Sequence, residues 1–130
     1  MFSVRIIKEE DYPELLTWWK WHRFPAPDLE MLPNSGVMLS KEGINICAGY
    51  IYFTNSKICW IEFIVSNPNY RESDRKEAIK ELILQLGYIA KDNGFKVAYT
   101  NLKNPSLINR FADCEFIKGS TNTTEMIKML

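Results

Sequence analysis

Three consecutive strand-like segments that lead into a long charged helix constrain the fold of this chain most strongly. The segments are residues 37–40, 44–54 and 57–66. They are rich in β-branched and aromatic residues and are separated only by short turns, so they predict an antiparallel meander. The last segment stops at Asn67-Pro68, and apolar periodicity then predicts a helix from near Ser73 to Asn93-Gly94.

Strand and helix patterns alternate along the rest of the chain. A helix is expected from Asp11, with Pro13 in its first turn, to about His22, and another begins at Asn104-Pro105. Further strands are expected at residues 2–8, 95–100, 115–118 and 124–130, and a helical turn at 28–31. One strand–helix–strand crossover adds a parallel pair. The predicted fold class is therefore α/β (α+β): one domain over residues 1–130, with a mixed, mostly antiparallel sheet of six to seven strands and helices on both faces.

One carboxylate interrupts the third segment of the meander. Regular alternation would place Ile58, Trp60, Glu62 and Ile64 on one face, and Cys59, Ile61, Phe63 and Val65 on the other. Both faces of this strand are then expected to be buried, which makes Glu62 the residue that needs a chemical explanation.

Composition excludes several classes of function. The chain has 130 residues, of which 46% are hydrophobic, and this is enough for one core and short for two. Sixteen basic residues balance sixteen acidic ones, so net charge does not favour nucleic acid or an anionic membrane as a partner. Three cysteines without C-x-x-C spacing favour free buried thiols, and with no signal or membrane segment in view we expect a cytoplasmic protein. A single histidine argues against a triad hydrolase and a zinc site.

Two local patterns together resemble a known family. Residues 62–71, Glu-Phe-Ile-Val-Ser-Asn-Pro-Asn-Tyr-Arg, are followed later in the chain by residues 104–111, Asn-Pro-Ser-Leu-Ile-Asn-Arg-Phe, and then by Phe116. The first is similar to the central strand and the h-P-x-Y-R loop entry of the GNAT superfamily of acyl-CoA-dependent N-acyltransferases. The second resembles that family's late helix, N-x-x-A-x-x-x-Y-x-x-x-G-F. The resemblance spans the whole chain and implies acetyl-CoA as co-substrate and a primary amine, on a small molecule or a macromolecule, as acceptor.

The resemblance also implies where the cofactor lies. Backbone of Ile64, Val65 and Ser66 would hold the pantetheine, and Arg71, Ser73, Asp74 and Arg75 would surround the pyrophosphate. Independently of the family, a strand that runs directly into a helix leaves unpaired N–H groups that suit a phosphate. The family loop has small residues where this chain has Asp74 and Lys76. The alternative is that Asp74 or Ser73 is simply the N-cap of the helix.

Glu62 is the candidate general base. Its apolar strand should raise its pKa by desolvation, and the family often has a catalytic glutamate at this point. The alternative is a structural pair with a buried arginine or a backbone donor. The family's proton-donating tyrosine corresponds to Phe111, so Tyr99, Tyr70 or solvent would protonate the thiolate. Asn104 would help to hold the cofactor arm, or is only an N-cap before a proline.

The acceptor side is suggested by the aromatic and basic segment at the end of the first helix. In the family this region borders the acceptor pocket, which implicates Trp21, His22 and Phe24 in substrate binding. The alternative is that the rings of this helix belong to the core, as the helical spacing of Leu15, Trp18 and Trp19 indicates.

The function expected from these observations is an N-acetyltransferase that moves an acetyl group from acetyl-CoA to a primary amine by direct attack. The altered loop and Phe111 leave open a second interpretation, a catalytically inactive GNAT-like module that contacts a protein or nucleic acid. Both a monomer and a homodimer are compatible with the sequence.

Overall fold

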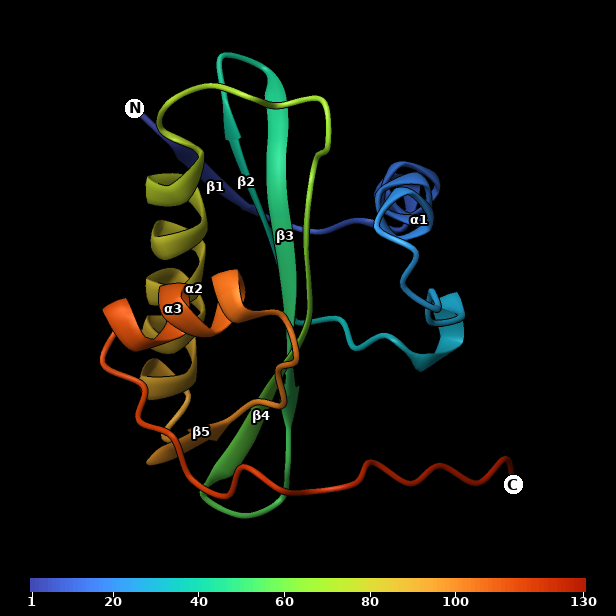
Figure 1. Cartoon of the computed structure of the whole chain (residues 1–130), viewed down its shortest axis with the longest axis vertical. Coiled ribbons are helices and arrows are strands. Elements are labelled where there is room, and N and C mark those ends of the chain that lie inside the picture. Colours follow the sequence, from blue (N-terminus) through green and yellow to red (C-terminus); the bar gives the residue numbers. More distant parts are fainter.

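The computed structural model describes residues 1–130 and contains one five-stranded sheet between two helical layers (Figure 1). Its elements are β1 (Ser3–Ile6), the 3₁₀ helix η1 (Glu9–Asp11), α1 (Tyr12–Trp21), the 3₁₀ helix η2 (Leu29–Met31), β2 (Gly36–Lys41), β3 (Ile44–Phe53), β4 (Ile58–Ser66), α2 (Arg75–Asp92), β5 (Val97–Tyr99) and α3 (Pro105–Asp113). Helix α1 lies on one face of the sheet, and α2 and α3 lie on the other (Figure 1).

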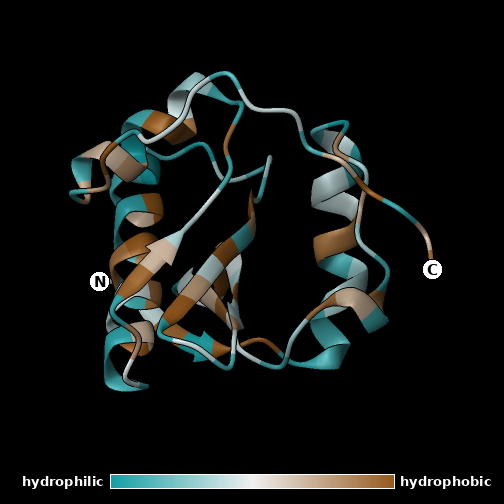
Figure 2. Ribbon diagram, turned by 90° about the horizontal axis from the view of Figure 1, so that it is seen from below, coloured by the Kyte–Doolittle hydropathy of each residue, from teal (hydrophilic) through white to brown (hydrophobic).

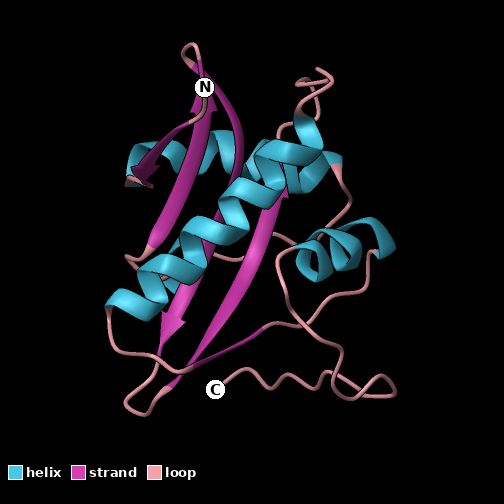
Figure 3. Cartoon of the chain, turned by 90° about the vertical axis from the view of Figure 1, so that its left-hand side faces the viewer, coloured by secondary structure: helices cyan, strands magenta, loops and turns pink.

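The strand order follows the chain order from β1 to β5. Pairs β1–β2, β2–β3 and β3–β4 are antiparallel, so the predicted meander is confirmed. The β4–α2–β5 crossover makes the last pair parallel, as expected for a strand–helix–strand unit. Helix α2 crosses the strands diagonally on its face of the sheet (Figure 3).

Two hydrophobic clusters hold the layers together. The larger has 14 buried residues and joins the sheet to α2 and α3, with Leu82, Ile83 and Leu86 of α2 at most 1% exposed. The smaller has seven buried residues and joins the sheet to α1, including Trp18 and Trp19. The hydrophobic colouring of the strands between the helices follows this arrangement (Figure 2). The two predicted core faces of the sheet therefore exist, each covered by an amphipathic helix.

The predicted last strands are wrong. Residues 115–118 and 124–130 form no strand, and β5 is limited to Val97–Tyr99 instead of 95–100, so the sheet has five strands and not six to seven. Glu115, two residues after the end of α3, has a φ of 70°, and the following residues run along the surface, with Met126 88% exposed and Ile127 79% exposed. Apolar alternation predicts a strand only if the segment pairs with the sheet and buries one face, and these residues do neither, although β5 has an unpaired outer edge.

Two further expectations concern cysteines and membranes. Cys47 and Cys59 are buried, Cys114 is partly buried, and all three are free thiols, as predicted. No helix has both the length and the apolar character that crossing a bilayer requires.

Candidate functional site

The central strand β4 contains a bulge directly after Glu62. Tyr50 of β3 pairs with Glu62, but Ala48 pairs with Val65, so one residue of β3 opposes both Phe63 and Ile64. Phe63 has a φ of 57°, in the left-handed region that few bulky residues adopt.

The bulge reverses the alternation that the sequence predicted. Ile64 packs into the larger cluster, on the α2 side, whereas Phe63 and Val65 pack into the smaller cluster, on the α1 side. The predicted faces are thus correct up to Glu62 and wrong for the next three residues. An extra residue in a strand shifts every later side chain to the opposite face.

Gly49 is the β3 residue opposite the bulge, and its lack of a side chain is needed there. A Cβ atom at this position would lie 2.6 Å from Cδ1 of Ile64 and 3.0 Å from Cδ1 of Leu86. The Ile64 side chain therefore lies over the backbone of Gly49, in the space that any other residue would fill.

Beyond the bulge, β4 has a free edge on the side of β5. The parallel pairing contains only Ile58 with Val97, Cys59 with Ala98 and Trp60 with Tyr99. From Glu62 to Ser66 no strand pairs with this edge, so those backbone N–H and C=O groups of Ile64, Val65 and Ser66 that point away from β3 are available to an extended ligand, except the Ser66 carbonyl, which lies 2.9 Å from Nε2 of His22. These are the three residues that the family resemblance implicates in pantetheine binding.

Glu62 is half-buried on the α1 face of β4, opposite Tyr50. Burial raises the pKa of Glu62 to about 7, the charge of Glu125 contributes to this rise, and a hydrogen bond from the backbone of Asn101 opposes it. No arginine or lysine forms an ion pair with Glu62. A carboxyl group of this kind can both accept and release a proton near neutral pH, which is what a general base requires.

Tyr99 lies at the end of β5, beside the free edge of β4. Its ring stacks on that of Trp60, with ring centroids 5.0 Å apart, and it is 47% exposed. Trp60 and Glu62 are two residues apart in the regular part of the strand and share a face, so the phenol and the carboxyl group lie on one side of the sheet. Phe111 is 2% exposed and packs against Phe116 in the core, where it has no access to a ligand.

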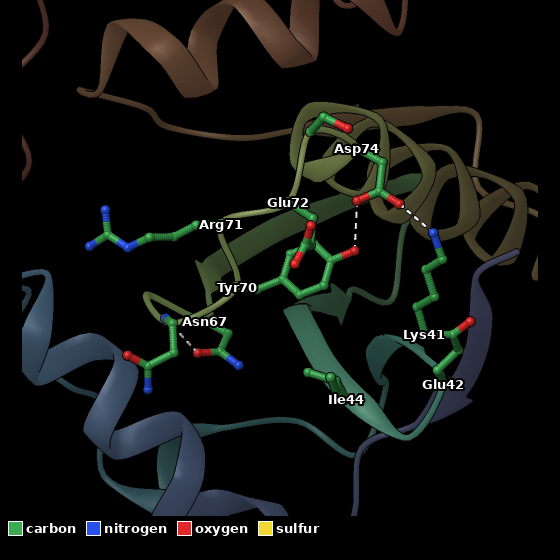
Figure 4. A pocket seen from close by; sticks show the side chains of 10 residues that line it. Lys41, Glu42, Ile44, Asn67, Tyr70, Arg71, Glu72 and Asp74 are labelled. Carbon is green, nitrogen blue, oxygen red and sulfur yellow. Dashed lines mark hydrogen bonds and ion pairs between the residues drawn. The ribbon is translucent and has the colours of Figure 1, made fainter.

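The loop from β4 to α2 lines an open pocket of about 600 Å³, shown in Figure 4. The pocket is bounded on its other side by the hairpin between β2 and β3. Asn67 fixes the beginning of the loop, because its amide donates to the carbonyl of Asn45 (2.8 Å) and its side-chain oxygen accepts from the N–H of Asn69 (2.9 Å). Arg71 points away from the centre of the pocket (Figure 4).

Asp74 is the N-cap residue of α2, as one of the two alternatives predicted, but its side chain forms no capping hydrogen bond. One carboxylate oxygen accepts from the hydroxyl of Tyr70 (2.6 Å), and the other is 2.7 Å from Nζ of Lys41 (Figure 4). These contacts lower the pKa of Asp74, first through the hydrogen bond from Lys41 and then through that from Tyr70. We call Lys41, Asp74 and Tyr70 the Asp74 bridge.

Because the Asp74 carboxylate is held in the bridge, it forms no hydrogen bond with the N–H groups in the first turn of α2. Neither the N–H of Lys76 nor that of Glu77 has a hydrogen-bond partner, whereas the N–H of Arg75 donates to the carbonyl of Glu72. No residue from Arg71 to Lys76 has a positive φ, so the loop adopts its path without the glycines of the family pattern. Arg75 also reaches back to β4, with a guanidinium nitrogen 3.4 Å from Oγ of Ser66.

The end of α1 approaches the end of β4. Nε2 of His22 lies 2.9 Å from the carbonyl oxygen of Ser66, and the rings of Phe24 and Phe63 meet edge to face at 6.3 Å. Trp21 is 58% exposed and Phe24 is 48% exposed, while Trp18 and Trp19 are core residues. The structure therefore divides the aromatic segment into a buried half and an exposed half that lies beside β4.

Asn104 is the N-cap of α3, as its position before a proline predicted. Its side-chain oxygen accepts from the N–H of Leu107 at 3.1 Å. This contact explains the residue structurally without a ligand.

Sequence reasoning missed two residues of this region. Lys41 lies 33 positions from Asp74, and no local pattern marks their contact. Tyr52 lies near Glu62, and its pKa is raised to about 12 by burial and by the charge of that carboxyl group. Its hydroxyl donates to the carbonyl of Met31 (2.7 Å), and only knowledge of the β3–β4 register could have identified it.

Comparison with known proteins shows the fold. No protein-family model and no curated protein matches the sequence. Among solved structures, N-acetylglutamate synthase from Neisseria gonorrhoeae, complexed with coenzyme A and L-arginine, matches with a TM-score of 0.73 and 15% identity over 92% of this chain. This chain covers only 28% of that synthase.

Two other matches have about the same length as this chain. Glucosamine-6-phosphate N-acetyltransferase from Arabidopsis thaliana has a TM-score of 0.68 and 12% identity, over 98% of this chain and 99% of that one. An aminoglycoside acetyltransferase from an uncultured soil metagenomic sample has a TM-score of 0.66 and 15% identity, over 99% and 96%. The fold that the resemblance implied is therefore shared with these solved structures.

Proposed function

We propose that this chain is an N-acetyltransferase that transfers the acetyl group of acetyl-CoA to a primary amine by direct attack. The observation that carries the proposal is the position of Glu62, half-buried with a pKa of about 7, where the free edge of β4 begins. A proton acceptor active near neutral pH and an extended binding edge thus lie next to each other.

The residues present fit a CoA-type co-substrate. The free edge from Ile64 to Ser66 supplies backbone donors and acceptors for a pantetheine amide. The open N–H groups of Lys76 and Glu77, together with the α2 dipole, suit a pyrophosphate. Arg71 and Arg75 add positive charge, and neither forms an ion pair with a carboxylate. The coenzyme A bound to the synthase of the same fold supports this assignment.

In this mechanism Glu62 accepts a proton from the acceptor ammonium, directly or through water, and leaves a neutral amine. The amine nitrogen forms a bond to the thioester carbonyl carbon and passes its surplus proton to solvent, the carbon–sulfur bond breaks, and the thiolate takes a proton from Tyr99, which solvent reprotonates, or directly from solvent. Bound acetyl-CoA supplies the activated acetyl group, so no covalent enzyme intermediate is needed. Trp21, His22 and Phe24 border the acceptor, on the side of β4 where Glu62 lies.

Calorimetric titration with acetyl-CoA and CoA is the first test of the proposal. We expect both to bind and to raise the melting temperature. Mass spectrometry of a panel of primary amines then tests acetyl transfer, and Glu62→Gln should lower kcat by about a hundredfold while CoA still binds. Absence of both heat and thermal stabilisation at millimolar CoA would refute the proposal.

The second candidate is a GNAT-like binding module without catalysis. It is favoured by Phe111, which replaces the family's tyrosine and is buried in the core. This candidate predicts no acetyl transfer to any amine and no effect of Glu62→Gln on binding of the partner, so the same titrations and assays separate the two.

A further inference from the structure

The Asp74 bridge joins three segments that lie apart in the sequence. Lys41 comes from the end of β2, Tyr70 from the loop after β4, and Asp74 from the residue before α2 (Figure 4). Each carboxylate oxygen of Asp74 has one partner, the hydroxyl of Tyr70 at 2.6 Å or Nζ of Lys41 at 2.7 Å. Tyr70 is only 7% exposed, so its hydroxyl is a fixed partner.

The contacts of the Asp74 bridge determine the direction in which the Asp74 carboxylate points. Aspartate before a helix ordinarily turns its carboxylate towards the first N–H groups, which it stabilises by hydrogen bonding and by its charge. Here the carboxylate instead points to the hairpin side of the loop, and the ammonium of Lys41 compensates its charge. The N–H groups of Lys76 and Glu77 are left open.

We propose that Lys41 is a positioning residue for the co-substrate: acting through Asp74, it keeps a carboxylate away from the phosphate-binding end of α2. This inference rests on the proposed function, and it explains how the loop accepts aspartate where the family pattern has a small residue. Lys41 does not touch the ligand, because its ammonium is occupied by Asp74 on the hairpin side. Arg71, by contrast, extends away from the bridge (Figure 4).

A double-mutant cycle tests this inference. Affinity for CoA is measured by calorimetry at low salt for the wild type, Lys41→Met, Asp74→Ala and the double variant, with thermal unfolding to check that each folds. An uncompensated carboxylate beside a phosphate at a partly exposed, solvent-screened site should weaken CoA binding by about tenfold, which is the loss expected for Lys41→Met. Asp74→Ala should bind CoA about as well as the wild type, within about twofold, and the double variant should match Asp74→Ala.

Two further variants make the result specific. Lys41→Arg keeps the ion pair and should restore CoA affinity. Lys80→Met is the control, because Lys80 is about as exposed as Lys41 and lies 3.7 Å from Glu77 on α2. It should leave CoA affinity within about twofold of the wild type, since it does not redirect Asp74. If the proposed enzyme is active, Lys41→Met should raise the KM for acetyl-CoA and leave kcat unchanged.

The same loss from Lys41→Met in the Asp74→Ala background would overturn the inference, because Lys41 would then act on the ligand itself. No loss in either background would overturn it as well. If the wild type does not bind CoA, the proposed function fails, and inorganic pyrophosphate becomes the probe, monitored by the amide resonances of Lys76 and Glu77. If pyrophosphate affinity then varies among the wild type and the three variants as expected for CoA, the inference about Lys41 holds although the proposed function has failed. If pyrophosphate does not change these amide resonances, the inference is refuted together with the proposed function.

Discussion

Replacing Glu62 with glutamine removes a carboxyl group whose pKa burial raises from 4.5 to about 7. The folded protein therefore holds this proton more tightly than the unfolded chain does. The stabilising contribution is fully present below about pH 4.5 and is lost as the pH rises through about 7. Glutamine is neutral at every pH, so the stability of Glu62→Gln should not follow this loss.

The structure limits the size of the effect. Each step of one in pKa corresponds to about 1.4 kcal/mol, so the rise to about 7 gives an upper limit of about 3.4 kcal/mol. Glu62 is only half-buried, and screening by solvent reduces this figure to about 1–2 kcal/mol. For a chain of this length that corresponds to about 4–7 °C in melting temperature.

Thermal unfolding of the wild type and Glu62→Gln at pH 4.5 and pH 8 measures the difference. From pH 4.5 to pH 8, the free energy of unfolding of Glu62→Gln should rise by about 1–2 kcal/mol relative to that of the wild type. Glu30→Gln, at an exposed site without side-chain hydrogen bonds, is the matched control and should show no such gain. An equal stability difference at both pH values would show that the sheet does not perturb Glu62, and the assignment of the general base would lose its physical basis.

Gly36→Ala should destabilise the fold by about 2 kcal/mol, because its Cβ would lie 2.6 Å from the buried ring of Tyr50, whereas Gly87→Ala, in open space on α2, should stabilise it by about 0.5–1 kcal/mol. Urea denaturation measures both, and equal effects would contradict the contact argument. Asn104→Ala should cost about 1 kcal/mol through the lost cap of α3 and leave CoA affinity unchanged; a large loss of CoA affinity by calorimetry would instead place Asn104 in the cofactor site. Tyr99→Phe should lower kcat by about tenfold or more if the phenol protonates the thiolate, with KM nearly unchanged, and unaltered steady-state kinetics would assign that proton to solvent.

Elements whose signals are local could be predicted from the sequence. Apolar periodicity and capping residues located α2 and α3, and the short turns located β2, β3 and β4 within one or two residues. Glu62 could be singled out because it is a charged residue in an apolar strand. Each of these inferences needs only neighbours along the chain.

Features that depend on register and distant contacts could not be predicted. The bulge after Glu62 depends on Gly49 of the neighbouring strand, and the Asp74 bridge depends on Lys41. Asp74 has the residue type and position of an N-cap, but a tertiary ion pair determines its orientation. Residues 124–130 have the composition of a strand, but no edge of the sheet pairs with them.

The bulge at Phe63 and Ile64 changes which face of the sheet the later side chains of β4 point to. If the same residues followed regular alternation with no bulge, Val65 would point into the layer of α2 and Ile64 into the layer of α1, and each would meet the wrong neighbours. Deleting Phe63 would remove the bulge but leave Ile64 on the α2 side and Val65 on the α1 side, because regular alternation from Glu62 would then give these same two faces. A single left-handed residue thus lets one continuous strand serve two differently shaped cores.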